Sequence, residues 1–570
     1  MKYTHHNNEL NLTHLNTPVY LKGWVQKARN LGGLIFIDLR DRFGITQLVV
    51  RPEQKDYATA LKIRSEFVIE VQGTVIERES KNKHLPTGDI EIAVTELTVL
   101  SEAKTPPITV ADVTDALEDT RLKYRYLDLR RPVMQNYLIK RHRITQAIRQ
   151  YLVNEQFYEL ETPILGKSTP EGARDYLVPS RLYPGQFYAL PQSPQIYKQL
   201  FMVSGFERYF QIAKCFRDED LRSDRQPEFT QVDIEASFIE ETDVYHWIEG
   251  LMQHLFKTVL NKEIKTPFER LTYETAVQTY GSDKPDLRFG LMFQNYQPLL
   301  SALEIPLFEN KQYIKGFVLP EGAKLTRRQI DQYTDLVKKH HGEALVFLKK
   351  QAGVYSGSIH KWLNNDLYQS LNLNDEDILF IVPGNSEAAL FALGELRNQV
   401  AKDFELTDPN DYVFTWITDW PLLEYDEEEN RYYAKHHPFT QPQDVEVLKK
   451  NPAQALARAY DIVLNGYEIG GGSLRIHQKE MQKLMFDTLG ISESDIQERF
   501  GFFVEALQYG TPPHGGIALG LDRIVMLMTH THNIKDVIAF PKTQSAKDLM
   551  MESPSEVAEE QLTDLKIKVE

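Results

Sequence analysis

Apolar and polar residues alternate along FTQVDIEAS, residues 229–237, with the period of two that is typical of a β-strand. A second alternating segment, RYFQIAKCF at 208–216, precedes it, so we predict a long antiparallel hairpin with one buried apolar face. The opposite face carries Arg217, Phe229, Gln231, Asp233 and Glu235. A flat ring can stack on a base while a neighbouring guanidinium holds a phosphate, so this face is a candidate nucleotide site.

The first hundred residues contain five short alternating segments separated by turns. Five strands in a segment of this length indicate a small barrel of the OB-fold type. One barrel face is predicted to carry Lys27, Arg29, Phe36 and Gln47, a mixture of cations, an aromatic ring and an amide. Such a face can stack on and hydrogen-bond single-stranded bases, but a solvated barrel face explains the same residues equally well.

A linker containing Pro106-Pro107 follows, and then apolar residues at helical spacing predict an amphipathic helix over 134–156, with Arg141 in its apolar seam. Residues 286–415 combine the helical segment TRRQIDQYTDLVKKH with the strand DILFIVPG, which indicates an inserted α+β module. The predicted organisation is an OB-fold domain at 1–104, a linker or hinge at 105–135, a main domain at 136–285 and 416–570, the latter with a C-terminal extension, and the insertion at 286–415.

Composition excludes several classes of protein. A chain of 570 residues is too long for one hydrophobic core, and no apolar run reaches the 18 residues that a membrane-spanning helix needs. A single cysteine, Cys215, rules out a disulfide framework and a cysteine-based zinc site. The N-terminus lacks the pattern of a secretory signal, so we expect a cytoplasmic protein without membrane contact.

Net charge gives little support for a nucleic-acid partner. The chain carries a formal charge of −16, whereas its first 104 residues hold 14 Lys and Arg against 13 Asp and Glu. Phosphate binding depends largely on Lys and Arg, so the N-terminal segment is merely the end that repels a polyanion least.

A second set of chemical groups lies in DIVLNGYEIGGGSLR at 461–475. Asn465-Gly466 predicts a tight hairpin turn that pairs Val463 with Glu468 and places Asp461 on the face of Glu468. Two carboxylates so placed can share Mg²⁺, which prefers one or two protein carboxylates together with phosphate and water. Two solvated acids on a hairpin remain the alternative.

The segment GGIALGLDRIVML at 515–527 has the glycine spacing of a phosphate loop, but Leu521-Asp522 replaces the Lys-Ser/Thr pair that such a loop requires. No GxGxxG motif is present, so neither a Walker loop nor a Rossmann turn fits. Arg523 is expected near the start of an apolar helix, where a cation opposes the helix dipole unless an anion lies close. A bound phosphate would supply that anion.

These segments together resemble the class II aminoacyl-tRNA synthetases. FRDEDLRSDRQPEFTQVDIE is similar to motif 2, GIALGLDRIVML to motif 3, and the helix before Pro163 to motif 1, the dimer-interface element. STPEGARDYLVPSR, LPQSPQIYKQL, KHHPFT and AYDIVLNGYEIGGGSLRIH narrow the resemblance to the bacterial-type aspartyl-tRNA synthetases. It covers nearly the whole chain and implies a homodimeric, multidomain α+β protein: an N-terminal OB-fold β-barrel that binds the anticodon, a catalytic domain with an antiparallel sheet flanked by helices, and an inserted α+β domain.

The resemblance also implies roles for individual residues. Arg217 and Arg523 are the implied catalytic residues, on the α- and γ-phosphates of ATP. Implied ATP contacts are Arg217, Asp218, Glu219, Gln226, Phe229, Glu468, Gly520, Leu521, Asp522 and Arg523. Implied aspartate contacts are Glu171, Ser193, Gln195, Lys198, Arg217, Asp233, His436 and Arg475. Asp461 and Glu468 would bind Mg²⁺, and Arg29, Leu31, Phe36 and Gln47 would read the anticodon.

The implied reaction is the ATP-dependent activation of L-aspartate to an aspartyl-adenylate, followed by transfer to the terminal adenosine of tRNA(Asp). Asparagine would be rejected because its neutral amide leaves the buried cations of Lys198 and Arg475 unpaired. The same pair argues against a lysyl-tRNA synthetase.

Three questions stay open on the residues alone. An asparaginyl-tRNA synthetase and a non-catalytic tRNA-binding paralogue are the alternative functions, and the intact Arg217, Asp461, Glu468 and Arg523 oppose the paralogue. His436 and His437 are adjacent, and only the family pattern selects His436 for substrate contact. Leu31 stands where members that also charge asparagine tRNA often carry histidine, so we expect the strict type.

Overall fold

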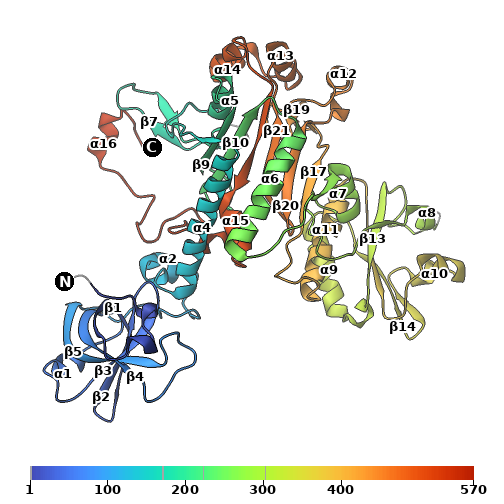
Figure 1. The fold of residues 1–570 in the computed structure, drawn as a ribbon. Coiled ribbons are helices and arrows are strands. Elements are labelled where there is room, and N and C mark those ends of the chain that lie inside the picture. The colour runs from blue at the N-terminus through green and yellow to red at the C-terminus, as the bar shows by residue number, and fades with distance from the viewer. Residues whose placement is uncertain (1–2, 170–172, 222–223, 302, 304, 570) are drawn as a thin grey trace. The chain divides into compact units, whose positions relative to one another are not determined.

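The computed structural model describes residues 3–169, 173–221, 224–301, 303 and 305–569, and these form two compact units (Figure 1). The first unit comprises Met1–Asn136 with Lys547–Pro554, and the second comprises Tyr137–Ala546 with Ser555–Glu570. No helix in the described part of the chain is long and apolar enough to cross a membrane.

The first unit contains a closed five-stranded barrel in the order β1-β2-β3-β5-β4. All its strand pairs are antiparallel except β3 with β5. Alternate residues of each strand point inward and form one apolar core, as their period-two pattern predicts. The elements of this unit are β1 Pro18–Leu31, β2 Leu34–Arg40, β3 Ile45–Val50, α1 Tyr57–Ala60, β4 Val68–Glu77, β5 Ile90–Ser101, α2 Glu118–Lys123 and α3 Arg125–Asp128.

The second unit is built on an eight-stranded sheet in the order β11-β17-β20-β21-β22-β10-β9-β6. The interior pairs are antiparallel, and only the edge pairs β11–β17 and β6–β9 are parallel. The fold class expected from the sequence, an OB-fold barrel followed by an antiparallel sheet with helices, is confirmed. The strands are β6 Tyr158–Glu159, β9 Arg208–Phe216, β10 Glu228–Ser237, β11 Glu269–Thr272, β17 Phe414–Thr418, β20 Ala459–Leu464, β21 Tyr467–Leu474 and β22 His514–Gly520.

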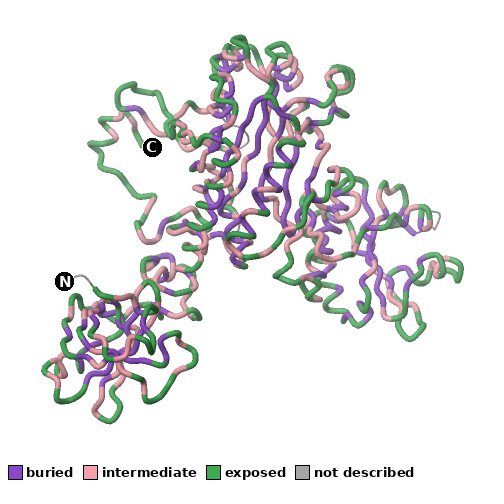
Figure 2. Tube along the Cα trace, viewed as in Figure 1, coloured by how far each residue is buried: buried purple, intermediate pink, exposed green. Residues whose placement is uncertain are grey.

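The apolar face of this sheet packs against three helices: α4 Pro132–Asn154, α6 Glu241–Leu255 and α15 Leu521–Met528. Their apolar side chains join Phe210, Val232 and Ile234 of the sheet in one core. Figure 2 shows the central strands as buried along most of their length. The polar face of β10 is also buried at its end, because α5 Gln195–Val203 covers it.

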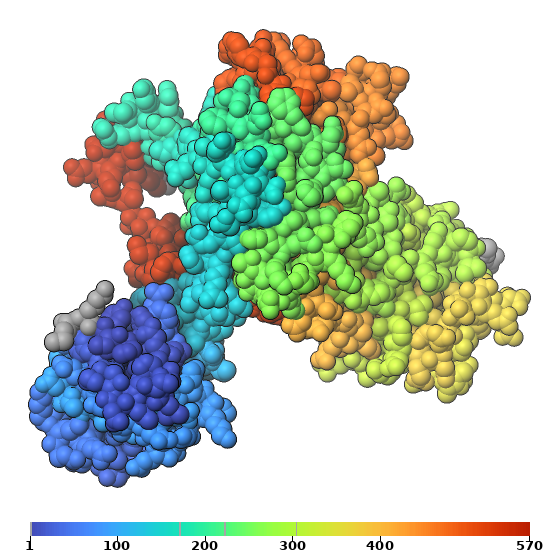
Figure 3. Space-filling model, viewed as in Figure 1, coloured from blue at the N-terminus to red at the C-terminus, as the bar shows by residue number. Residues whose placement is uncertain are grey.

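A second, five-stranded sheet of order β12-β13-β16-β14-β15 forms the inserted module, whose surface is a separate yellow-green to yellow lobe in Figure 3. The segment TRRQIDQYTDLVKKH forms a helix whose first turn is capped by the side chain of Thr326, and DILFIVPG forms the central strand. The elements are β12 Gln294–Asn295, α8 Gln297–Leu300, β13 Tyr313–Leu319, α9 Arg327–Lys339, β14 Val346–Gln351, β15 Val354–Gly357, α10 Asn365–Leu371, β16 Ile378–Gly384 and α11 Ala388–Asp403.

Shorter elements complete the second unit around its sheets. They are β7 Leu177–Pro179, β8 Phe187–Ala189, α7 Tyr273–Tyr280, β18 Leu423–Asp426, β19 Arg431–Ala434, α12 Val445–Lys450, α13 Lys479–Thr488, α14 Glu493–Ala506 and α16 Glu559–Asp564.

Candidate active site

The predicted hairpin of β9 and β10 forms, with Cys215 opposite Phe229 and Gln211 opposite Asp233. Arg217 directly follows β9, and its backbone N–H donates to the carbonyl of Pro227 at 2.9 Å. The guanidinium carbon of Arg217 lies 5.1 Å from the centroid of the Phe229 ring. The ring and the cation expected on this face are therefore neighbours.

Two adjoining cavities lie over the polar face of the hairpin. One has a volume of about 230 Å³ and is bounded by the ends of β10 and β22 and by the start of α15. The other, of about 500 Å³, extends toward α5 and β21. Volumes of this order are typical of small-molecule sites. The residues that line both cavities are Arg217, Glu219, Gln231, Glu468 and Ala518.

Arg523 stands in the first turn of α15, as the sequence predicted, and lines the smaller cavity. Its guanidinium donates to the backbone carbonyl of Glu468 and lies 3.1 Å from the carboxylate of Asp224. Asp224 was not identified from the sequence, because nothing near it in the chain indicates a partner 299 residues away.

Other residues implied in ATP binding occupy different surroundings. Gln226 lines the smaller cavity, and its amide exchanges hydrogen bonds with the backbone of Lys542, at 3.2 and 2.8 Å. Asp522 is 3% exposed and accepts a hydrogen bond from the backbone N–H of Thr230 at 2.8 Å. The side chain of Leu521 belongs to the apolar core, and Asp218 is half-exposed outside both cavities, 3.7 Å from Arg174.

Four fully buried charged residues form an ion network at the far end of the larger cavity. Lys198 Nζ lies 3.1 Å from Asp233 and 3.4 Å from Glu235. Arg475 holds Glu235 with two hydrogen bonds, at 2.9 and 3.2 Å. No role was assigned to Glu235 from the sequence. Its position two residues after Asp233, on the same strand face, could have indicated that it belongs to the same site.

This network changes the physical reason for selecting an acid over an amide. The expectation that asparagine would leave Lys198 and Arg475 unpaired does not hold as stated, because Asp233 and Glu235 already pair with both cations.

The position of Glu235 requires a glycine at residue 516, since a Cβ there would lie 2.2 Å from Glu235 Oε2.

Two carboxylates in the network differ in their pKa. Burial raises the pKa of Asp233, and the charge of Lys198 only partly offsets this effect. Burial acts on Glu235 in the same direction, but the charges of Arg475 and Lys198 outweigh it and hold the pKa of Glu235 below its ordinary value. Glu235 is therefore the firmly ionised partner that fixes Arg475.

The two adjacent histidines lie in different environments. His437 accepts a hydrogen bond from the Arg475 guanidinium through Nε2, and burial together with that cation holds its pKa well below 6.5. His436 packs edge-on against Trp420, and its Nε2 lies 3.8 Å from Asp461. His437 is thus a neutral acceptor that orients Arg475, while Nδ1 of His436 is buried without a hydrogen-bond partner.

Asp461 and Glu468 both line the larger cavity, on the hairpin of β20 and β21. The predicted pair of Val463 and Glu468 forms, but a bulge follows it, so Asp461 lies opposite Gly471 instead of Gly470. Gly471 makes room for the carboxylate of Asp461, because a Cβ there would lie 2.4 Å from that carboxylate.

Burial raises the pKa of Asp461 to about 6, and the charge of Glu468 adds to this effect. Two carboxylates that repel each other beside an open cavity fit Mg²⁺, which takes one or two carboxylates and completes its shell with phosphate and water. Among the described residues, no group of three or more His, Cys, Asp or Glu forms a metal-binding set.

Buried polar atoms without partners mark the two cavities. Among the described residues, nine buried side-chain nitrogen or oxygen atoms lack a hydrogen-bond partner. Such atoms are rare in native proteins and indicate a missing ligand or water. Five of the nine line the cavities: Arg217 Nε, Arg523 Nε, Asp233 Oδ2, Gln195 Nε2 and His436 Nδ1.

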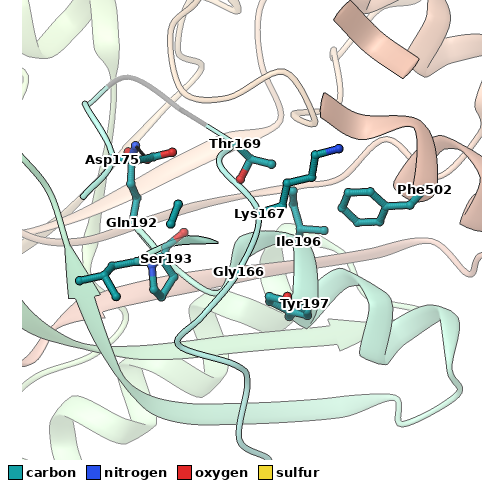
Figure 4. A pocket seen from close by; sticks show the side chains of 12 residues that line it. Gly166, Lys167, Thr169, Asp175, Gln192, Ser193, Ile196, Tyr197 and Phe502 are labelled. Carbon is teal, nitrogen blue, oxygen red and sulfur yellow. Dashed lines mark hydrogen bonds between the residues drawn. The ribbon is translucent and has the colours of Figure 1, made fainter. Parts of the chain in front are cut away.

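A third, smaller cavity is lined by Gln192 and Ser193, two residues that also line the larger cavity (Figure 4). Gly166, Lys167 and Thr169 enter it from the loop that precedes Asp175, and the ring of Phe502 faces it from α14. Gln192 donates to the carbonyl of Ala173 at 2.8 Å and so ties this loop to the cavity wall. Glu171, expected on a lid here, lies outside the described residues.

The barrel brings together three of the four residues expected to read an anticodon. Arg29 lies opposite Phe36, and its guanidinium reaches Asp38 at 2.8 Å and Gln47 at 3.4 Å. Leu31, at the end of β1, is 60% exposed. Arg29 Nε and Arg78 Nε are two further buried atoms without partners. This face therefore combines cations and a ring with the carboxylates of Asp38 and Glu91, which bind Arg29 and Gln47.

Comparison with protein families gives two matches. Residues 117–544 match the family described as tRNA synthetases class II (D, K and N). Residues 19–100 match the family described as OB-fold nucleic acid binding domain. Together they cover the barrel and nearly all of the second unit.

Full-length relatives give the same result. The chain is 52% identical to the aspartate–tRNA ligase of Aster yellows witches'-broom phytoplasma, over 100% of this chain and 99% of the relative. It is 52% identical to the aspartate–tRNA(Asp/Asn) ligase of Anoxybacillus flavithermus, over 99% and 98%. A solved structure of asparaginyl-tRNA synthetase from Pyrococcus horikoshii, complexed with asparaginyl-adenylate, shares the fold with a TM-score of 0.61 at 18% identity, over 95% of this chain and 98% of that one.

Proposed function

We infer the function from the family to which the chain belongs, the class II tRNA synthetases of the D, K and N group, and we propose that it joins L-aspartate to tRNA. Members of this family use ATP as a substrate. The proposed reaction activates aspartate as an aspartyl-adenylate and then transfers the aspartyl group to the terminal adenosine of tRNA(Asp). The asparaginyl alternative is disfavoured, because the full-length relatives are aspartate–tRNA ligases.

One observation carries the proposal: the unpartnered atoms in the cavities match the charges of the two substrates. Arg217 Nε and Arg523 Nε are donors that suit the phosphates of ATP, whereas Asp233 Oδ2 is an acceptor that suits an ammonium group. These atoms lie in cavities that share one wall, so two bound substrates would meet at Arg217.

In the proposed mechanism the protein positions reactants and stabilises charge. ATP occupies the smaller cavity, with adenine stacked on Phe229 near Glu219 and Gln226, and with the γ-phosphate at Arg523. The aspartate α-carboxylate attacks the α-phosphorus, the bond to the pyrophosphate oxygen breaks, and Arg217 stabilises the charge that develops on the α-phosphoryl oxygens. No protein nucleophile takes part.

The residues at the β20–β21 hairpin fit Mg²⁺, and we propose that Asp461 and Glu468 hold it. When bound, the ion would neutralise phosphate charge. Gly520, Leu521 and Asp522 form the start of α15 and keep Arg523 in the cavity, and Asp218 supports the segment after Arg217.

For the amino acid, we propose that the substrate ammonium binds Asp233 beside Gln195 and Ser193. This draws Asp233 away from Lys198, so Lys198 and Arg475 gain a partner in the side-chain carboxylate of aspartate, next to His436. Asparagine offers no such charge and leaves the network with an excess positive charge. An uncompensated buried charge costs roughly 3–5 kcal/mol, which is ample discrimination.

For tRNA, we propose that the barrel reads the anticodon through Arg29, Leu31, Phe36 and Gln47. A relative named aspartate–tRNA ligase and one named aspartate–tRNA(Asp/Asn) ligase are equally identical to this chain, so identity does not choose between the strict and the relaxed type. Leu31 supports the strict type, which charges only tRNA(Asp). Aspartylation assays with purified tRNA(Asp) and tRNA(Asn) test this, and comparable charging of both would refute it.

We further propose that the protein is a homodimer and that it acts in the cytoplasm, where both ATP and tRNA are present. A dimer is supported by the resemblance of α4 to motif 1 and by apolar side chains left exposed on and near it, among them Ile139, Val153 and Tyr158. Sedimentation at micromolar concentration should give twice the 66.1 kDa of the chain.

The deciding experiment for the reaction is ATP–pyrophosphate exchange. We expect exchange that depends on aspartate and is not supported by asparagine. Exchange with asparagine instead of aspartate would select the asparaginyl function, and tRNA binding without any exchange would select a non-catalytic paralogue.

A further inference from the structure

Arg397, on α11 of the inserted module, is one of the largest fully buried side chains in the described part of the chain, at 1% exposure. It has no role in the reaction proposed above. Its Nε donates to the carbonyl of Leu291 at 3.1 Å, and its Nη2 donates to the carbonyls of Asp286, Phe289 and Gly290 at 2.9, 3.0 and 2.9 Å.

The partners of this cation are backbone carbonyls and aromatic rings. The guanidinium carbon lies 4.0 Å from the centroid of Phe289 and 5.0 Å from that of Tyr280. No carboxylate lies within ion-pair distance of Arg397 among the residues that the structure describes. Burial lowers its pKa to about 10. A buried cation of this kind is costly, and its planar fork suits the fixing of several carbonyls at once.

All four carbonyls belong to one short segment, 286–291, which connects the main sheet with the inserted module. We call residues 281–291 the entry segment. At its start, Gly281 ends α7 with a left-handed conformation, φ 65°, against the backbone of Gly394 on α11. A Cβ on Gly394 would lie 2.2 Å from the carbonyl oxygen of Gly281. The entry segment is therefore held against α11 at two places.

The entry segment also lines the larger cavity through Asp283 and contacts the turn of the β20–β21 hairpin through Asp286. Asp283 lines the larger cavity, and its charge contributes to the pKa of Asp461. Asp286, whose carboxylate is held by Arg288 at 2.6 Å, lies under the turn of the β20–β21 hairpin. A Cβ on Gly466 in that turn would lie 3.1 Å from Asp286 Cβ.

The geometry points to Arg397 as a positioning residue: by fixing the entry segment it sets the position of the β20–β21 hairpin, and with it the carboxylates of Asp461 and Glu468 that bind ATP and its metal ion. The placement of the inserted module is thereby linked to nucleotide binding. This inference rests on the proposed function only for its kinetic readout, because the hairpin contact itself is independent of substrate.

The test uses the full-length variant Arg397→Lys, which keeps the charge but cannot reach four carbonyls through one Nζ. We expect the KM for ATP to rise about tenfold at limiting Mg²⁺, equivalent to roughly 1.4 kcal/mol of binding, with the KM for aspartate changed much less. Hydrogen–deuterium exchange of the amides at 461–468 should become faster than in the unmodified chain.

Tyr333→Phe is the matched control, since the Tyr333 hydroxyl donates to Asp403 at 2.8 Å within the same module and touches no entry-segment residue. We expect Tyr333→Phe to leave the hydrogen–deuterium exchange of the amides at 461–468 and the KM for ATP unchanged. If Arg397→Lys leaves both readouts unchanged as well, the inference is overturned.

A second variant covers the possibility that Arg397→Lys does not fold. Asp286→Ala leaves α11 intact but removes the pair with Arg288, and it should change both readouts in the same direction by about threefold. Unchanged readouts in this variant would also overturn the inference. If the unmodified chain shows no aspartate-dependent ATP–pyrophosphate exchange, only the proposed function is refuted. Hydrogen–deuterium exchange of the amides at 461–468 still tests the effect of Arg397 on the hairpin.

Discussion

Arg141 on α4 is hydrogen-bonded to the carboxylate of Asp522 on α15, although 381 residues separate them in the chain. The same guanidinium donates to the Thr230 hydroxyl at 3.2 Å, and the Thr230 N–H donates to Asp522 at 2.8 Å. A cation in the apolar seam of a helix is thus explained by a buried carboxylate one residue before Arg523. The long helix, β10 and the start of α15 are joined at this point.

Replacing Arg141 with methionine should therefore be strongly destabilising. The change leaves Asp522 buried without its cation, which costs about 3 kcal/mol or more, and it should raise the KM for ATP because the turn carrying Arg523 loosens. Thermal unfolding measures the loss of stability, and ATP–pyrophosphate exchange kinetics measure the KM for ATP. Arg149→Met on the same helix is the control, since the pair of Arg149 with Glu159 is exposed and contributes at most about 1 kcal/mol. Equal effects of both variants would contradict this account.

Glu235→Gln should destabilise the chain in a way that depends on pH. The folded state holds the pKa of Glu235 below the 4.5 of an unperturbed carboxyl, so its ionised form stabilises the fold above pH 4.5 and this contribution is lost as the pH falls further. We expect a difference of about 3 kcal/mol from the unmodified chain at pH 7. That difference should shrink below pH 4.5 in thermal unfolding experiments, and a constant difference would argue against the ion pair.

Asp233→Asn should separate stability from activity. Burial raises the pKa of Asp233, whereas that of Glu235 is lowered, so Asp233→Asn should lower the melting temperature by less than Glu235→Gln does. The kcat/KM for aspartate should fall at least about 100-fold, because the ammonium loses its carboxylate. Glu228→Gln, which alters an exposed pair with Lys214 on the same strand, is the control for both measurements. Normal kcat/KM in Asp233→Asn would remove Asp233 from the substrate site.

Glu468→Gln should raise the Mg²⁺ concentration needed for half-maximal ATP–pyrophosphate exchange by about tenfold, since one of two proposed carboxylate ligands becomes neutral. Direct ATP-binding measurements across a Mg²⁺ titration should show the same shift. Glu446→Gln, which alters an exposed pair with Lys449 at 2.9 Å, should leave the Mg²⁺ dependence unchanged. An unaltered titration for Glu468→Gln would place the metal elsewhere.

Arg29→Ala should weaken tRNA binding and leave ATP–pyrophosphate exchange unaffected, because it removes a cation of the barrel face. A contact of this kind is worth about 1–3 kcal/mol, so the KM for tRNA should rise between about 5-fold and 150-fold. Lys22→Ala removes another cation of β1, one that pairs with Glu70 away from Phe36 and Gln47, and should change tRNA binding much less. Equal losses in the two variants would show only a general effect of charge.

Local pattern was enough to predict the two hairpins and the start of α15. Period two placed Arg217, Phe229 and Asp233 on one face, and Asn465-Gly466 located the turn beside Glu468. These predictions depend on residues close together in the chain, where strand geometry and turn chemistry decide the outcome.

The remaining site residues could not be identified in this way. Glu235 binds Arg475 across 240 residues, and His437 binds Arg475 across 38. The bulge between Ile462 and Val463 also escaped prediction, since turn chemistry fixes only the pairs next to Asn465-Gly466. Such contacts depend on how strands are ordered in the sheet, and no local pattern encodes that order.

Because Arg217, Glu219 and Glu468 line both cavities, the occupant of one cavity becomes part of the wall of the other. The two affinities are then linked through a single coupling free energy. Whatever factor a nucleotide applies to the dissociation constant of the amino acid, the amino acid must apply in return to that of the nucleotide.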